Sequence, residues 1–252
     1  MNASLEGRAA FISGAGHGIG RATALEMARL GATVGVNDLK PEFVEDTAAE
    51  IRRIGGKVVA VPGDVSTRDG MREAVLRFAR EAGRLDVMVN NAAWVRYQPL
   101  AEITPEVMDR MVEIGFKSVI WGIQAAAEAM DPERGGSIVN VASIAAFKSP
   151  ARSVVYSGLK AGVLGITRAA AADLGARRIR VNAVAPGAVP TEGTAKHRNA
   201  ELDARRIART PLGRLGTVED IADAICFLAG DGARFISADV LRLDGGASET
   251  SL

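Results

Sequence analysis

The sequence predicts an α/β fold in which a doubly wound parallel sheet of about seven strands carries helices on both faces. Short β-branched runs alternate with longer amphipathic stretches along the whole chain, an alternation typical of parallel sheets. The runs are apolar throughout, which suits strands buried on both faces. No linker, charge block or internal repeat divides the chain, so one domain over residues 1–252 is expected.

The β-branched runs predict strands at 9–13, 32–37, 57–61, 85–90, 137–142, 180–185 and 239–244. The amphipathic stretches predict helices at 19–30, 42–54, 67–82, 105–130, 154–175 and 217–229. Segment 187–216 is polar, punctuated by Gly and Pro, and too long for a simple connection. We expect it to act as a substrate lid. It carries basic residues that suit either an anionic ligand or, more simply, a solvated helix face: Lys196, Arg198, Arg205, Arg206 and Arg209.

Charge and cysteine content exclude several function classes. The chain has 31 Lys and Arg against 30 Asp and Glu, a net charge of +1, which argues against nucleic acid or an anionic membrane as a partner. The single cysteine, Cys226, can form neither an internal disulfide nor a thiolate metal cluster, and no metal site is expected. No apolar run is long enough to span a membrane and no signal peptide is recognisable. A cytoplasmic protein is expected.

A glycine-rich turn is the first motif that points to chemistry. The first predicted strand runs into SGAGHGIG (13–20) and then into a helix, where absent side chains let backbone N–H groups approach a pyrophosphate. Asp38 ends the next strand, 18 residues after Gly20, where a carboxylate can accept ribose hydroxyls and repel a 2′-phosphate. We therefore expect NAD(H) rather than NADP(H). The turn residues expected to contact it are Gly14, Gly16, His17, Gly18, Ile19 and Gly20.

The spacing of this turn resembles the TGxxxGxG motif of the short-chain dehydrogenase/reductase family, with Ser13 in place of Thr. GDVS (63–66), VNNAA (89–93), PGAVPT (186–191) and a terminal VLRLDGG are similar to further motifs of that family. The resemblance covers nearly the whole chain and implies a Rossmann-like fold. It implies cofactor contacts from Asp64 and Val65 to the adenine, from Asn91 and Ala92 after the fourth strand, and from Pro186, Gly187, Val189 and Thr191 to the nicotinamide.

The stretch SIVNVAS…YSGLK supplies the catalytic candidates Ser143, Tyr156 and Lys160, at the spacing of this family. Tyr and Lys four residues apart project from one helix face, so the ammonium and a positive nicotinamide ring would favour the phenolate. Tyr156 would then exchange a proton with the substrate oxygen, and Ser143 would hydrogen-bond that oxygen. The resemblance also implies that Lys160 and Tyr156 contact the nicotinamide ribose.

One position departs from the family pattern. Gly115 stands where the resemblance implies an Asn that anchors a water relaying protons to the lysine. Glycine has no amide, although it can leave a helix kink and room for water. Two possibilities stay open: backbone carbonyls hold the water and activity persists, or the relay is impaired and turnover is slow.

The expected function is NAD-dependent interconversion of a secondary alcohol and a ketone. The alternative is a weakly active or non-catalytic NAD(H)-binding regulatory protein, which Gly115 alone supports. Family resemblance implies a homodimer or homotetramer packed through the helical stretches 105–130 and 154–175. The substrate is expected to be a small molecule that contacts Ser143, Ala145, Trp94, Arg96, Phe147 and Tyr156.

Overall fold

The computed structural model describes residues 4–193 and 199–250. Seven strands form one sheet, in which every adjacent pair is parallel. The strands are β1 (Ala9–Ile12), β2 (Thr33–Val36), β3 (Lys57–Ala60), β4 (Val87–Asn90), β5 (Gly136–Val141), β6 (Ile179–Pro186) and β7 (Val240–Leu243). The predicted α/β class and all seven strands are confirmed.

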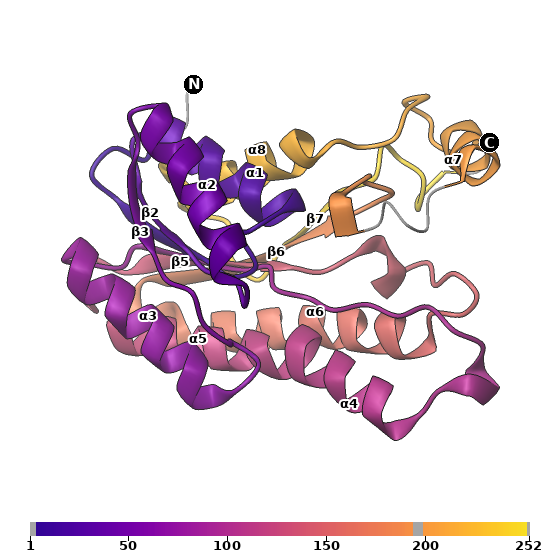
Figure 1. Cartoon of the computed structure of the whole chain (residues 1–252), viewed down its shortest axis with the longest axis horizontal. Helices are drawn as coiled ribbons and strands as arrows, with labels where there is room; N and C mark the ends of the chain where they lie inside the picture. The colour runs from indigo at the N-terminus through magenta and orange to yellow at the C-terminus, as the bar shows by residue number, and fades with distance from the viewer. Residues whose placement is uncertain (1–3, 194–198, 251–252) are drawn as a thin grey trace.

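The helices cover both faces of the sheet (Figure 1). One layer contains α1 (Gly18–Arg29), α2 (Pro41–Arg53) and α8 (Val218–Ala229), and the other contains α3 (Arg68–Ala82), α4 (Pro105–Val112), α5 (Ser118–Ala129) and α6 (Val154–Leu174). Two apolar cores lie on the two sides, and strand residues such as Ile12 and Phe11 alternate between them.

The strand order is β3-β2-β1-β4-β5-β6-β7. The chain therefore reverses its winding direction between β1 and β4. In sheets of this kind, ligands bind outside the carboxyl ends of the strands at such a switch point. The glycine turn after β1 and the segment after β4 lie there.

Two predicted segments differ from the structure. The helix expected over 105–130 is interrupted by a π-helical turn, Glu113–Lys117, that separates α4 from α5. The segment 187–216 contains a helix, α7 (Ala200–Ala208), which has no Gly or Pro of its own and was not among the predicted helices. Residues 194–198, with Lys196 and Arg198 of the predicted basic cluster, lie outside the described residues.

Candidate active site

The glycine turn leaves no room for side chains. Gly14 and Gly18 have φ of +64° and +56°, a region that L side chains rarely adopt. A Cβ on Gly20 would lie 2.1 Å from the carbonyl oxygen of Gly14, and one on Gly16 would lie 2.6 Å from the Phe43 Cβ. Glycine at these positions is therefore a steric requirement of the turn.

The N-terminus of α1 binds an anionic group of the chain itself. α1 begins at Gly18, and the preceding His17 makes no side-chain cap, so the first N–H groups stay available to an anion. The Gly18 N–H donates to a Glu192 carboxylate oxygen at 3.0 Å. The N-terminal end of α1 therefore accommodates a negatively charged group, here the Glu192 side chain.

Ser13 and Asn91 fix the turn to the end of β4. The Ser13 hydroxyl accepts hydrogen bonds from the backbone N–H groups of Asn91 and Ala92, both at 3.1 Å. The Asn91 amide donates to the carbonyl oxygens of Ser13 at 3.0 Å and Gly14 at 2.9 Å. Sequence reasoning assigned Asn91 to the cofactor and missed this bracing role, for which the hydroxyl at position 13 was the available signal.

Asp38 lies against the turn, beside His17. One Asp38 carboxylate oxygen accepts from the Gly16 N–H at 3.2 Å and lies 3.7 Å from the His17 Nδ1. Burial raises the pKa of Asp38, but the hydrogen bonds from His17 and Gly16 outweigh it, and the pKa is lowered overall. The same contact with Asp38 raises the pKa of His17. Asp38 is therefore ionised at neutral pH, and the His17 imidazole lies beside it.

The other predicted cofactor residues surround the same edge of the sheet. Asp64 is exposed after β3 and its carboxylate accepts from the Ser66 N–H at 2.8 Å, while Val65 is buried. Pro186 ends β6, and Gly187 donates its N–H to the Leu243 carbonyl oxygen at 2.9 Å. Segment 186–191 then reaches α1. The remaining residues here are half-buried, with Ile19 and Val189 packed on one core and Thr191 within 3.3 Å of a Cβ built on Gly18.

Ser143 and Tyr156 lie together between the end of β5 and the start of α6. Ser143 is 8% exposed, and its hydroxyl also accepts from the Ala145 N–H at 3.1 Å. Burial raises the pKa of Tyr156, and a hydrogen bond with the Ser143 side chain opposes that rise. The edge of the Tyr97 ring packs on Tyr156, with centroids 5.6 Å apart. Tyr156 is therefore a neutral phenol held in one orientation by two neighbours.

Lys160 is one turn further along α6. Its side chain is buried, and its Nζ donates to the Val141 carbonyl oxygen at 2.6 Å. Burial lowers the pKa of Lys160 to about 8. The sequence argument expected Lys160 to lower the pKa of Tyr156. In this structure burial dominates, and the amine is directed to the strand carbonyl instead.

Gly115 occupies the middle of the π-helical turn and packs on α6. A Cβ on Gly115 would lie 3.1 Å from a methyl carbon of Leu159, the residue that precedes Lys160 on α6. The Ser118 hydroxyl donates to the Ile114 carbonyl oxygen at 2.6 Å, which satisfies one group of the widened turn. The helix irregularity suggested for this glycine is thus present, and π-helical turns often lie at functional sites.

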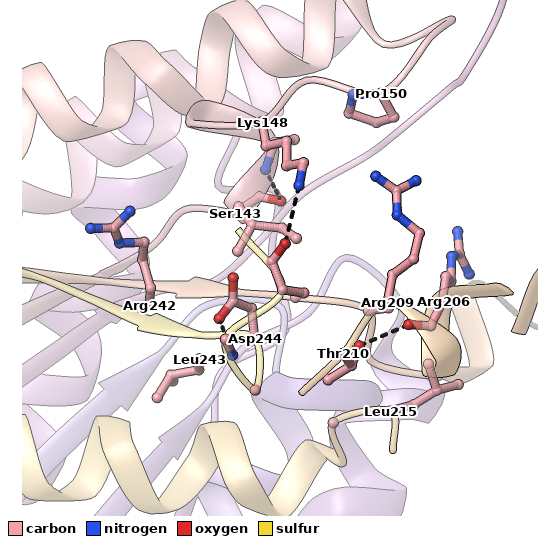
Figure 2. A pocket seen from close by; sticks show the side chains of 18 of the residues that line it. Ser143, Lys148, Pro150, Arg206, Arg209, Thr210, Leu215, Arg242, Leu243 and Asp244 are labelled. Atoms are coloured by element: carbon pink, nitrogen blue, oxygen red, sulfur yellow. Dashed lines mark hydrogen bonds between the residues drawn. The ribbon is translucent and has the colours of Figure 1, made fainter. Parts of the chain in front are cut away.

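A cavity of about 1030 Å³ opens beside Ser143 (Figure 2). Among its lining residues are Ser143, Ala145 and Tyr97, together with residues of the 187–216 segment and of the turn after β7. Four predicted substrate residues are not among its lining residues: Tyr156, which packs on the lining residue Tyr97, and Trp94, Phe147 and Arg96. The Trp94 ring lies under the Arg110 guanidinium at 4.5 Å, Phe147 lies under Arg242 at 4.8 Å, and Arg96 is exposed. The contacts of Trp94 with Arg110 and of Phe147 with Arg242 join residues far apart in the chain, so the sequence alone could not predict them.

In the described ranges, 4–193 and 199–250, no helix combines the length and apolar character needed to cross a membrane. Within the same residues no group of three or more His, Cys, Asp or Glu side chains could hold a metal ion. Cys226 is a buried free thiol, and burial raises its pKa.

Comparison with known proteins gives consistent matches over the whole chain. Residues 14–248 match the family model described as Enoyl-(Acyl carrier protein) reductase. The chain is 38% identical over 242 residues to a 3-oxoacyl-(acyl-carrier-protein) reductase of Thermotoga maritima, covering 96% of this chain and 98% of that protein. It is 39% identical over 247 residues to the cis-4-hydroxycyclohexanecarboxylate dehydrogenase of Sinomonas cyclohexanicum, covering 98% of each.

A solved structure also matches nearly the whole chain. The 7α-hydroxysteroid dehydrogenase complexed with NADH and 7-oxo glycochenodeoxycholic acid superposes with a TM-score of 0.94. The two chains are 31% identical, and the match covers 99% of this chain and 97% of the other. The likeness therefore includes the sheet, both helical layers and the segments around the candidate site.

Proposed function

Because this chain belongs to the short-chain dehydrogenase/reductase family and is an oxidoreductase, we propose that it interconverts a secondary alcohol and a ketone using NAD(H). The observation that carries the proposal is that Ser143 lines the cavity, while Tyr156 lies beside it against the lining residue Tyr97 and buried Lys160 follows one turn later on α6. A hydroxyl donor beside a positioned phenol is what a substrate oxygen needs while its charge changes.

The glycine turn and its neighbours would hold the dinucleotide. The observations that fit it are the sterically obligatory Gly14, Gly16 and Gly20 and the α1 N-terminus that takes up the Glu192 carboxylate. The pyrophosphate would bind that N-terminus, and the Asp38 carboxylate would accept hydrogen bonds from the hydroxyls of the adenosine ribose. The bound nicotinamide would supply the hydride donor or acceptor.

Tyr156 would transfer the proton. Since its phenol is neutral in this structure, it is ready to donate to a ketone oxygen, with Ser143 holding that oxygen in place. In the oxidising direction the phenol must lose its proton first. Lys160, whose pKa of about 8 lies near neutrality, is the nearest basic group along α6 to assist that step.

Ionised Asp38 supports NAD(H) over NADP(H), because a 2′-phosphate would lie beside a carboxylate. The similar 7α-hydroxysteroid dehydrogenase was solved in complex with NADH. The test is a fluorescence titration of the protein with NADH and with NADPH. Tighter binding of NADPH would overturn the assignment of Asp38.

A second candidate activity is reduction of a 3-oxoacyl thioester. It is favoured by the similarity to the Thermotoga maritima reductase, whose name states that activity. The two candidates are separated by one panel, in which secondary alcohols, ketones and acetoacetyl-coenzyme A are tested with both dinucleotides by absorbance. Turnover of the thioester alone would favour the second candidate. Turnover of neither class, with dinucleotide still bound, would favour the non-catalytic alternative.

We also propose a homodimer or homotetramer that packs through α5 and α6. Small residues on one face of α6 are exposed and spaced three or four apart, as a close helix contact requires: Gly158, Ala161, Gly165, Ala169 and Ala172. The segment 187–216 would cover the substrate, and the protein would act in the cytoplasm, where the buried thiol of Cys226 would stay reduced. Light scattering of the purified protein distinguishes monomer, dimer and tetramer.

A further inference from the structure

The cavity beside Ser143 extends well beyond the space that an alcohol carbon needs. From Ser143 it reaches α7, the segment after it, and the turn that follows β7. Five basic side chains line it, against two acidic ones, Asp220 and Asp244. The basic residues are Lys148, Arg206, Arg209, Arg214 and Arg242.

Two of the arginines are neutralised by carboxylates. Arg214 forms a two-point contact with Asp220, with distances of 2.6 and 2.9 Å. Arg242 pairs with Glu249. The other lining acid, Asp244, accepts from the N–H groups of Gly246 and Ser248 at 2.9 and 2.8 Å and so shapes the turn after β7. These contacts explain, by structure alone, why most of the charged residues in the cavity wall are there.

Lys148 and Arg209 are different. Lys148 donates only to the Ala247 carbonyl oxygen at 3.2 Å, and in the described part of the chain neither side chain pairs with a carboxylate. Arg206 contacts Asp203 at 3.5 Å. Figure 2 shows Arg209 extending from the end of α7 toward the segment that carries Lys148 and Pro150, apart from Ser143. The positive charge without a carboxylate partner therefore lies in the cavity, with Arg209 on the side of α7 and Lys148 in the segment that follows Ser143.

Tyr97 connects this charge with the catalytic candidates. Its ring packs on Tyr156, and its phenol lies within electrostatic range of Arg206, which lowers its pKa against the larger effect of burial. A molecule with its reacting carbon at Ser143 and Tyr156 and its body along Tyr97 would meet α7 next. The wall between the two ends is largely apolar, with Ile144, Leu202 and Leu215 among its residues.

From these contacts we infer that the cavity binds a substrate bearing a carboxylate remote from the reacting carbon, and that Arg209 and Lys148 are the residues that select it. A guanidinium presents two parallel donors to a carboxylate, and an unpaired cation in a partly enclosed cavity gains a partner when such a group binds. The inference rests on the proposed function for the position of the reacting carbon. It adds the class of substrate, a hydroxy or oxo acid.

Binding of unreactive probes tests the inference without turnover. Cyclohexanecarboxylate and its neutral amide would be titrated calorimetrically into the protein in the presence of NADH. We expect the carboxylate to bind at least about tenfold more tightly than the amide, and that preference to be lost in Arg209→Gln and reduced in Lys148→Gln. Arg205→Gln is the matched control, because Arg205 lies on α7, pairs with Glu201 at 2.6 Å and does not line the cavity.

Equal affinity for carboxylate and amide, or a preference that survives Arg209→Gln, would overturn the inference. Turnover then separates it from the proposed function. With medium-chain hydroxy acids and their methyl esters, we expect a lower KM for the acids and loss of that advantage in Arg209→Gln. Equal turnover of acid and ester in both proteins would contradict the proposed carboxylate site but would still support the proposed oxidoreductase activity. Carboxylate binding without turnover of any alcohol or ketone would support the site and contradict the proposed function.

Discussion

In the turn between β1 and α1, steric contacts allow only glycine at several positions. The wall of the cavity beside Ser143, by contrast, consists of side chains for which the fold would accept other residue types. At Gly20 a single added carbon would lie 2.1 Å from a carbonyl oxygen. Among the described residues, neither Arg209 nor Lys148 has a carboxylate partner that would require its charge. The glycines of the turn are therefore explained by backbone geometry, whereas the charges of Arg209 and Lys148 are explained by the ligand that we propose.

Among the changes that compare the two regions, the largest expected effect is at the cavity, which Ser143 lines. Ser143→Ala removes the hydroxyl that would hold the substrate oxygen, and we expect kcat to fall by about a hundredfold to a thousandfold. Affinity for NADH should not change. Steady-state kinetics with the best substrate of the panel, together with an NADH titration, measures both. Ser143→Thr keeps a hydroxyl and should recover part of the activity; equal losses in both variants would assign Ser143 a packing role instead.

In the glycine turn, one added methyl group at Gly20 should be enough to weaken NADH binding strongly. Gly20→Ala forces Gly14 and Asn91 to move, so we expect about 2 kcal/mol of lost stability and at least about thirtyfold weaker NADH binding. Chemical denaturation measures the free energy of unfolding, and titration measures the affinity for NADH. Gly175→Ala is the control: Gly175 has φ −58° and ψ −40° with open space around it, and alanine there should stabilise by about 0.5–1 kcal/mol. Similar losses in both variants would refute the steric argument.

Glu192 lies where the two regions meet, and its removal should favour the cofactor. The carboxylate occupies the Gly18 N–H that a pyrophosphate would use, so Glu192→Gln should tighten NADH binding about twofold to fivefold. The free protein should lose up to about 1 kcal/mol of stability. Glu201→Gln, on α7 and paired with Arg205, serves as control. Weaker NADH binding in Glu192→Gln would mean that the carboxylate assists the cofactor rather than competing with it.

The smallest expected effect is a pH dependence of cofactor choice. The raised pKa of His17 means that its contribution to stability is complete below pH ~6.5 and is lost as the pH rises through the folded value. The lowered pKa of Asp38 means that its contribution is present above ~3.8 and lost below its folded value. Glu192 also raises the pKa of His17, and Lys40 lowers it.

Protonated His17 partly neutralises Asp38, so the preference for NADH over NADPH should shrink as the pH falls toward 6, on the order of threefold. Titrations of both dinucleotides at several pH values measure the ratio. In His17→Gln the ratio should become independent of pH over that range. A ratio that still varies in the variant would assign the effect to another group.

The sequence was sufficient for the class of fold and for most of the residues at the switch point, because strands alternating with helices and glycines in a strand–turn–helix context have local causes. It was insufficient for α7, whose polar sequence resembles a loop, and for the π-helical turn at Gly115, which depends on packing against Leu159. The roles of Asn91 and Glu192 depend on partners 77 and 174 positions away. Only the folded chain brings those groups together.

Tyr156→Phe tests the central claim most directly, because it removes the phenol oxygen and retains the ring that packs on Tyr97. NADH formation from a panel of secondary alcohols and NAD⁺ would be followed by absorbance in both proteins, beside an NADH titration of each. We predict turnover in the wild type, a loss of about a thousandfold or more in the variant, and NADH still bound by the variant. Full turnover in Tyr156→Phe would contradict the account, as would a wild-type protein that binds NADH and transforms no alcohol or ketone.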